Sequence, residues 1–435
     1  MKCRFEKGTA DNLKDVCDRL GARGKMDLGP VVTTVQGVID DIKARGDEAV
    51  LEYTAKFDKA SLSSETMKVT ESEISEAYSQ LEKEDPELLR IMKTAASNIR
   101  AFHERQKETG FMMDTAKGSR IGVKVRPITV AGVYVPGGTA PLPSTVLMDV
   151  IPASVAGVPR IVFCTPPRAD GTIAPVILAA ADITGATEIY KVGGAQAISA
   201  MAYGTETIPR VDKICGPGNI YVNTAKRLVF GQVDIDMFAG PSEVLIIADE
   251  SSNPEFVAAD MLAQAEHDKM ASAIVLAVGD DLATKILEAA DRRSEAAERK
   301  EQLKGSMENY SAIISVDSID TAVAFSDELA PEHLELCVKD PEAVLERINN
   351  AGAVFLGNYS PEPLGDYFAG PNHTLPTSGT ARFFSPLNTG DFYKKMSVIN
   401  YNEESLKDVY KDVAKFARSE GLTCHAASME SRFEA

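Results

Sequence analysis

The 435-residue chain lacks any apolar run long enough to cross a membrane; its richest, Ala273 to Val278, is only strand-sized. The six cysteines are scattered with no C-x-x-C pair, which argues against a disulfide framework or a structural zinc site and favours a cytoplasmic location. The N-terminus lacks the apolar core of a signal peptide. Basic residues are outnumbered by acidic ones, which gives a net charge of -18. This argues against non-specific nucleic-acid binding, which needs clustered Lys and Arg.

The apolar pattern predicts the fold class. Apolar content of 44% and charged content of 25% are those of a globular protein, and the length allows two or more domains. Residues 1–110 carry apolar residues mostly at helical spacing. From residue 130 to 240, and again to residue 357, strands and helices alternate. This rhythm predicts two α/β domains with parallel sheets, and ligands at the carboxyl ends of the strands in the first.

Glycine-rich turns end three predicted strands of the first array: Gly137-Gly138, Gly193-Gly194 and Gly216-Pro217-Gly218-Asn219. Such turns let backbone N–H groups approach the phosphates of a nucleotide. The full G-x-G-x-x-G fingerprint is absent, and tight turns without a ligand are an equally good interpretation. The pattern alone leaves nucleotide binding open.

A helix is predicted to begin at Asn253, which can cap free N–H groups, with Pro254 in the first helical position. Gln264 and His267, three residues apart, lie on one face near its far end. A helical histidine of this kind is either a metal ligand or a polar residue at a helix end.

Zinc binds imidazole nitrogen and carboxylate oxygen, so His267, His425 and Asp366 would form a suitable site, with Gln264 as a weaker neutral donor. An amide ligand is unusual. Spacing therefore ranks two acids of the same helix region nearly as high: Asp260 and Glu266.

Histidines mark several predicted element ends. His267, His333, His373 and His425 each have an acid or amide nearby, and catalytic groups concentrate at such ends, although one or two are expected to be structural. His103, in a charged helical stretch, is expected to be solvated. Glu332 and His333 form an adjacent acid and imidazole suited to acid–base catalysis. The structural alternative is an exposed acid beside a histidine.

Long, unusual motifs run through essentially the whole chain: Tyr134-Val135-Pro136-Gly137-Gly138, Val192-Gly193-Gly194-Ala195-Gln196-Ala197, Gly216-Pro217-Gly218-Asn219, Ala239-Gly240-Pro241-Ser242-Glu243, Gln264-Ala265-Glu266-His267, Pro331-Glu332-His333, Gly365-Asp366-Tyr367, Asn372-His373-Thr374-Leu375-Pro376-Thr377 and Glu420-Gly421-Leu422. In this order they resemble the signature segments of the histidinol dehydrogenase family.

The resemblance implies a homodimer with one zinc ion per subunit that oxidises L-histidinol to L-histidine through an aldehyde, reducing two NAD molecules, in the last steps of histidine biosynthesis. No nucleic-acid or membrane partner is implied. The matching positions are Gln264, His267, Asp366 and His425 for the metal; Glu332 and His333 for catalysis; Tyr134, Gln196 and Asn219 for NAD; and Ser242 and Glu420 for the substrate, which the metal ligands and His333 also contact.

The resemblance also implies the domain organisation, with two Rossmann-like α/β domains. A helical N-terminal segment spans residues 1–25. The first α/β domain, with the metal and catalytic residues, spans 26–132 and 243–383, and the NAD-binding domain spans 133–242. A tail domain, 384–435, reaches across the dimer, so Glu420 and His425 would serve the partner's site.

Other functions remain as alternatives. A related NAD- and zinc-dependent dehydrogenase would oxidise another small polar alcohol, but Ser242 and Glu420, which match the substrate contacts, favour histidinol. Aldehyde oxidation through a thiohemiacetal would use Cys164 or Cys215 as nucleophile. A zinc hydrolase would use Glu332 on metal-bound water, and a non-catalytic α/β binding protein would need none of these groups.

Overall fold

The computed structural model describes residues 3–21, 29–137 and 141–434, so Gly138 and the predicted boundary after residue 25 lie outside the described residues. The chain forms two compact units. The larger comprises Met1–Gln106 and Thr129–Phe392, and the smaller comprises Lys107–Ile128 and Tyr393–Ala435. No described helix is both long and apolar enough to span a membrane.

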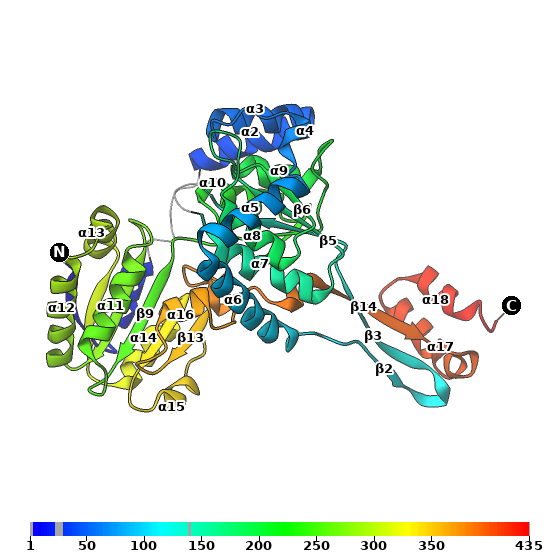
Figure 1. Ribbon diagram of the computed structural model, residues 1–435. Helices are drawn as coiled ribbons and strands as arrows, with labels where there is room; N and C mark the ends of the chain where they lie inside the picture. Colours follow the sequence, from blue (N-terminus) through cyan, green and yellow to red (C-terminus); the bar gives the residue numbers. More distant parts are fainter. Residues whose placement is uncertain (1–2, 22–28, 138–140, 435) are drawn as a thin grey trace. The chain divides into compact units, whose positions relative to one another are not determined.

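One sheet of the larger unit, of which β5 and β6 are labelled in Figure 1, has five parallel strands in the order β6-β5-β4-β7-β8. Numbered along the chain this order is 3-2-1-4-5, the Rossmann-like arrangement, in which the strand order reverses between β4 and β7. Ligands of such sheets bind outside the carboxyl ends of the strands near this reversal. The strands are β4 (Val130–Tyr134), β5 (Arg160–Thr165), β6 (Glu188–Lys191), β7 (Lys213–Cys215) and β8 (Asp234–Ile235).

Helices surround this sheet in two layers. The inner helices are α7 (Pro143–Ala156), α8 (Pro175–Thr184), α9 (Gly194–Tyr203) and α10 (Ile220–Val229). The outer helices are α2 (Gly29–Arg45), α3 (Asp47–Phe57), α4 (Ser64–Met67), α5 (Glu71–Glu84) and α6 (Pro86–Glu104). The outer helices were predicted to belong with the other sheet. Instead α2 packs on α9 and α10, α5 on α8 and α6 on α7, because their apolar faces are buried there.

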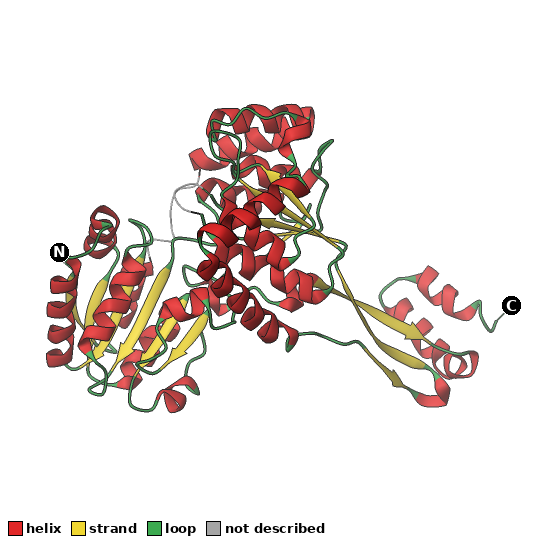
Figure 2. Ribbon diagram, in the orientation of Figure 1, coloured by secondary structure: helices red, strands yellow, loops and turns green. Residues whose placement is uncertain are grey.

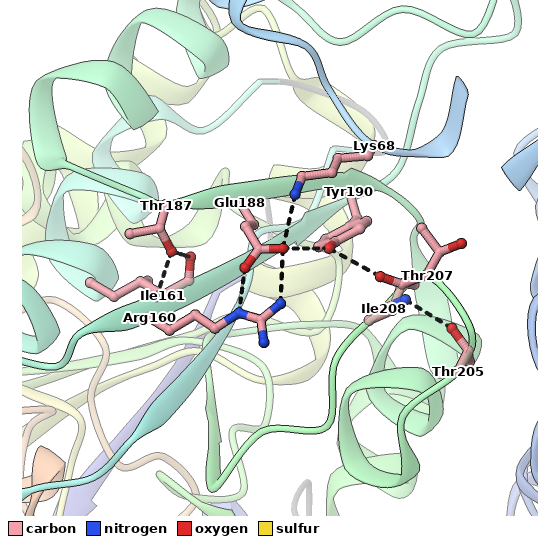
Figure 3. Close-up of polar contacts among 9 residues, drawn as sticks. All are labelled: Lys68, Arg160, Ile161, Thr187, Glu188, Tyr190, Thr205, Thr207 and Ile208. Carbon is pink, nitrogen blue, oxygen red and sulfur yellow. Dashed lines mark hydrogen bonds and ion pairs between the residues drawn. The ribbon is translucent and has the colours of Figure 1, made fainter. Parts of the chain in front are cut away.

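The edge strand β6 is covered by the segment that carries Lys68, which forms an isolated antiparallel bridge with Tyr190. Glu188 accepts hydrogen bonds from Lys68 (3.0 Å), Arg160 (3.1 Å) and the Tyr190 hydroxyl (2.7 Å), as Figure 3 shows. The bond to Arg160 is the main cause that lowers the pKa of Glu188 to about 2. These contacts are structural, since a covered and charged edge resists pairing with another chain.

The second sheet has six parallel strands in the order β1-β11-β10-β9-β12-β13. Its last five strands repeat the 3-2-1-4-5 order, which confirms the prediction of two α/β arrays. The N-terminal segment, predicted as helical, also supplies an edge strand, because β1 pairs with β11 along its length. The strands are β1 (Arg4–Gly8), β9 (Glu243–Ala248), β10 (Ser272–Val278), β11 (Ala312–Val316), β12 (His333–Cys337) and β13 (Ala353–Leu356).

Helices cover both faces of the six-stranded sheet, as Figure 2 shows. Alternate side chains of a strand point to opposite faces: Leu245 and Ile247 pack with α1 and α14, whereas Val244 and Ile246 pack with α11 and α12. The helices here are α1 (Leu13–Gly21), α11 (Pro254–Ala265), α12 (Asp280–Ser294), α13 (Lys300–Asn309), α14 (Ile319–Leu329), α15 (Pro341–Leu345) and α16 (Glu362–Tyr367), with the 3-10 turns η3 (Thr380–Arg382) and η4 (Thr389–Phe392).

The smaller unit is an antiparallel sheet, β14-β3-β2, with two helices. Asn402 caps the first helix by accepting a bond from Ser405 N (2.8 Å), and Lys117 pairs with Asp408 (2.5 Å). Gly421, with φ of +76°, takes the left-handed conformation predicted for the end of that helix. The elements are β2 (Phe111–Asp114), η2 (Ala116–Gly118), β3 (Arg120–Pro127), β14 (Tyr393–Asn400), α17 (Glu403–Ser419) and α18 (Thr423–Glu430).

His103 is buried, and the expectation that it is solvated was wrong. It lies on the same face of α6 as Met92, Ala96 and Ile99, which are also buried. Its Nδ1 is 2.7 Å from the side-chain oxygen of Gln106. The charged neighbours in the sequence lie on other faces of the helix, so composition concealed the burial of this one position.

Candidate active site

The predicted metal and catalytic residues of the larger unit meet at the amino edge of the six-stranded sheet. His333 is the first residue of β12, and it pairs in register with Val244 of β9, just after Ser242. Helix α11 runs back from the carboxyl edge, because β10 begins at Ser272 soon after the helix ends. Gln264 and His267 are therefore brought to the same edge as His333.

The ring of His333 is held in one tautomer. Its Nδ1 lies 2.9 Å from the backbone oxygen of Glu243, and since a carbonyl only accepts, Nδ1 carries the hydrogen. The other nitrogen, Nε2, is buried without a hydrogen-bond partner in the described part of the chain. Burial lowers the pKa of His333. The residue is thus a neutral imidazole with its basic nitrogen free.

Glu332 is oriented by the same peptide segment as His333. Its Oε2 accepts a hydrogen bond from the backbone N–H of Glu243 (2.8 Å) and lies 3.7 Å from Nδ1 of His333. Both side chains are buried, with relative exposures of 5% and 3%. The backbone of Glu243 therefore positions the carboxylate and the imidazole together, so the structural alternative of an exposed acid does not hold.

A group that could hold a metal ion lies at this edge. His267, Glu362 and Asp366 each offer a ligand atom, and these atoms lie within 4.8 Å of one another. Gln264 is fully buried, yet neither of its amide atoms has a hydrogen-bond partner among the residues that the structure describes. Nitrogen and carboxylate donors suit zinc, and a bound ion would satisfy the orphaned amide oxygen. The residues present fit such an ion.

Glu362 was not predicted from the sequence. It begins α16 and lies four residues before Asp366, so the two carboxylates share one face of the helix. Burial, reinforced by Asp366, raises the pKa of Glu362. The i, i+4 spacing to Asp366 was the one signal that could have identified it.

The alternative acids near α11 are placed differently. The side chain of Asp260 is hydrogen-bonded to Glu335, and burial raises its pKa to about 6. Glu266, the residue after α11, is exposed. Neither belongs to the group formed by His267, Glu362 and Asp366.

A cavity of about 450 Å³ opens beside this group, and His333, Asp366 and His373 line it. Nδ1 of His373 is 3.0 Å from the backbone oxygen of Asp366 and 3.8 Å from its Oδ1. His373, which the sequence marked only as a histidine at an element end, thus belongs to the same cluster. The cavity has the size of a small-molecule site.

The predicted NAD contacts share another cavity, of about 950 Å³, at the carboxyl ends of β4, β5 and β6. Tyr134, Gln196 and Asn219 all line it. The Tyr134 hydroxyl accepts a hydrogen bond from Gly194 N (3.1 Å), and the Asn219 side-chain oxygen caps α10. Glycine at position 216 allows the ends of β4 and β7 to approach each other, since a Cβ there would lie 2.0 Å from the backbone oxygen of Tyr134.

The two cysteines considered as nucleophiles lie inside the five-stranded sheet. Cys164 and Cys215 are fully buried, and burial raises the pKa of both thiols. A cysteine nucleophile requires an accessible thiolate and a lowered pKa. Oxidation through a thiohemiacetal on either residue is therefore contradicted.

Glu420 and His425 belong to the smaller unit, whereas the other predicted site residues belong to the larger unit. Glu420 caps the end of α17, and His425 lies in the first turn of α18. Both are exposed. Their side chains are free to meet a ligand or another chain, which is what a residue serving a partner's site requires.

The model of the histidinol dehydrogenase family matches residues 22–433. Histidinol dehydrogenase from Bacillus licheniformis is 53% identical over 398 residues, with 92% of each chain covered, and that from Clostridium acetobutylicum is 50% identical over 404 residues, with 93% of each covered. The crystal structure of histidinol dehydrogenase from Elizabethkingia anophelis matches 99% of this chain and 98% of its own, with a TM-score of 0.91 and 40% identity. On this match, the chain belongs to the histidinol dehydrogenase family of oxidoreductases.

Proposed function

We propose that the protein oxidises L-histidinol to L-histidine in two successive NAD-dependent steps, with one zinc ion per subunit. The observation that carries this proposal is the convergence at one sheet edge of a free basic nitrogen on His333 and a ligand group around Asp366. The atoms His333 Nε2 and Asp366 Oδ1 are 3.9 Å apart. A substrate held by the ligand group would therefore lie beside the base.

The proposed metal ligands are Gln264, His267, Asp366 and His425. Zinc, when bound, would act as a template that holds the imidazole and amino nitrogens of histidinol. Glu362 is buried beside Asp366, and its raised pKa means that the two carboxyl groups would share one proton when no metal is bound. Ser242, directly before β9, and Glu420 are the proposed further substrate contacts.

In the first step, Nε2 of His333 accepts the proton of the substrate hydroxyl while hydride leaves the adjacent carbon for NAD. His333 can do this because its Nδ1 hydrogen is already committed to the backbone oxygen of Glu243 (2.9 Å). A positioned base of this kind typically accelerates proton transfer by roughly 10²–10⁴-fold. The product of the step is the aldehyde.

In the second step, Glu332 takes a proton from a water molecule that adds to the aldehyde. His333 releases its first proton to solvent, and the resulting hydrate then loses its hydroxyl proton to His333 and a second hydride to NAD. One alcohol, one water and two NAD thus become one carboxylate, two NADH and three protons. The tether from Glu332 to Glu243 N (2.8 Å) keeps the carboxylate beside the base.

NAD would bind in the cavity lined by Tyr134, Gln196 and Asn219. Asn219 also lines a neighbouring cavity of about 780 Å³, whose wall includes Asp268, the residue next to His267. A dinucleotide could extend through both cavities, with its adenosine in the first and its nicotinamide toward the substrate.

We also propose that the smaller unit packs on a partner subunit, so that Glu420 and His425 complete the partner's site. This unit exposes large apolar side chains, among them Phe111, Met113, Ile399 and Phe416, with relative exposures of 58%, 51%, 75% and 70%. Apolar surface gathered on so small a unit indicates an interface.

Substrate selectivity tests the proposed function. The purified protein should reduce NAD with L-histidinol, but not with L-leucinol, which lacks the imidazole, or with 3-(imidazol-4-yl)propan-1-ol, which lacks only the amino group. Both nitrogens are needed for template binding. Equal turnover of L-leucinol would instead indicate a dehydrogenase of other small polar alcohols.

A further inference from the structure

The NAD cavity lacks an acid at the position where doubly wound sheets usually supply one. In such domains a carboxylate near the end of the second strand binds the adenosine ribose of NAD, whereas a nearby arginine accommodates a 2′-phosphate. Here the second strand is β5, which ends at Thr165 and continues as Pro166-Pro167 into the cavity wall. No residue of that stretch can play the role.

A carboxylate from another element lines the same cavity. Asp58 follows the last residue of α3 and stands in the wall with Tyr134. Its Oδ2 is buried and has no hydrogen-bond partner within the described residues. The next residue in the chain, Lys59, does not pair with it, because its Nζ donates to the backbone oxygen of Lys56 (2.7 Å).

The position of Asp58 does not stabilise a negative charge within the protein itself. The C-terminal end of a helix carries partial negative charge, and Asp58 lies at the end of α3. Burial raises the pKa of Asp58 to about 6, and no ionised neighbour contributes to that rise. The group is nevertheless ionised at neutral pH. An unpartnered charge in a cavity wall is typical of a ligand-binding residue.

We infer that Asp58 accepts hydrogen bonds from the adenosine ribose hydroxyls and thereby selects NAD over its 2′-phosphorylated form. The inference rests on the proposed function. A carboxylate only accepts hydrogen bonds, so it fits a pair of hydroxyl donors. A 2′-phosphate in the same place would put two like charges together. Arg168, which is exposed and also lines the cavity, is the group that would counteract this selection.

Binding of ribose probes to the full-length protein tests the inference by calorimetry, independently of turnover. The probes are ADP-ribose, 2′-deoxy-ADP-ribose and 2′-phospho-ADP-ribose. The wild type should prefer ADP-ribose to both analogues. Asp58→Asn and Asp58→Ala should each weaken ADP-ribose binding by roughly ten- to hundredfold, the usual range for a hydrogen bond to a charged group. Both variants should also bind the deoxy analogue nearly as well as ADP-ribose.

The matched control is Asp40→Asn. Asp40 is exposed on α2, whose residues Val35 and Val38 line the cavity while Asp40 itself does not. It should bind all three probes like the wild type. If the wild type reduces NAD but Asp58→Ala binds the probes unchanged, this inference alone is overturned. If the wild type binds none of them, the NAD assignment falls as well.

Discussion

Lys226 of α10 and Asp236, which follows β8, form a buried ion pair, with side-chain exposures of 0% and 1%. Together they bind both polar backbone atoms of Gly216. Lys226 Nζ donates to the Gly216 oxygen (2.9 Å), and Asp236 Oδ2 accepts from Gly216 N (2.8 Å). Gly216 begins the turn that ends at Asn219, a proposed NAD contact. The buried pair therefore fixes the shape of this turn.

Breaking this pair should destabilise the protein. Lys226→Met leaves the Asp236 carboxylate buried and unpaired, and loss of one partner of a buried pair typically costs about 3–5 kcal/mol. Thermal denaturation measures the effect. Lys285→Met is the matched control, since Lys285 pairs with Asp281 on the exposed surface (2.6 Å) and should matter little. Equal melting temperatures for the two variants would contradict the structural role of Lys226.

Asp149 should make stability depend on pH. It is fully buried beside the same turn, accepts a hydrogen bond from Thr374 Oγ1 (2.6 Å), and burial raises its pKa from 3.8 to about 8. The folded carboxyl keeps its proton where the unfolded one has lost it. The stabilisation that the protonated Asp149 contributes is therefore fully present below the unfolded pKa of 3.8. It declines as pH rises from there through the folded pKa of about 8.

Asp149→Asn should remove this dependence, because an amide keeps the bond to Thr374 without titrating. Its advantage over the wild type in free energy of unfolding should grow between about pH 5 and pH 8. Denaturation at both pH values measures this. An advantage of the same size at both would show that the Asp149 carboxyl does not titrate as described.

His333→Asn should lower kcat for histidinol by roughly 10²–10⁴-fold, the range for loss of a general base, with a smaller change in KM. Glu332→Gln should slow oxidation of the aldehyde more than oxidation of the alcohol, because only the second step needs activated water. Single-turnover assays started from each substrate separate the two. Near-normal turnover by His333→Asn would contradict its role as base.

Local features of the site region were predictable because neighbouring residues decide them. Asn253 does cap α11, accepting a hydrogen bond from Glu255 N (3.0 Å). The partners of a buried face could not be predicted, since periodicity indicates that a face is covered but not by what. For the same reason, the burial of His103 and the meeting of Glu362 with His267 depend on contacts between segments distant in the chain.

Removal of metal should strongly lower turnover, because His267 and Asp366 are proposed metal ligands. Dialysis against a chelator should lower the rate by more than about tenfold, and zinc should restore it. His267→Ala and Asp366→Ala should bind less metal per subunit by elemental analysis. Glu266→Gln is the matched control, as Glu266 is exposed and adjacent to His267. A metal-free protein with full activity would exclude this role for the cluster.

The stoichiometry of NADH formation tests the central claim most directly. A limiting amount of L-histidinol is consumed to completion with excess NAD, and NADH and histidine are both measured. A site in which His333 serves both hydride transfers and Glu332 activates water between them predicts two NADH and one histidine per histidinol. One NADH with accumulation of the aldehyde, or histidinol consumption without NADH, would contradict it.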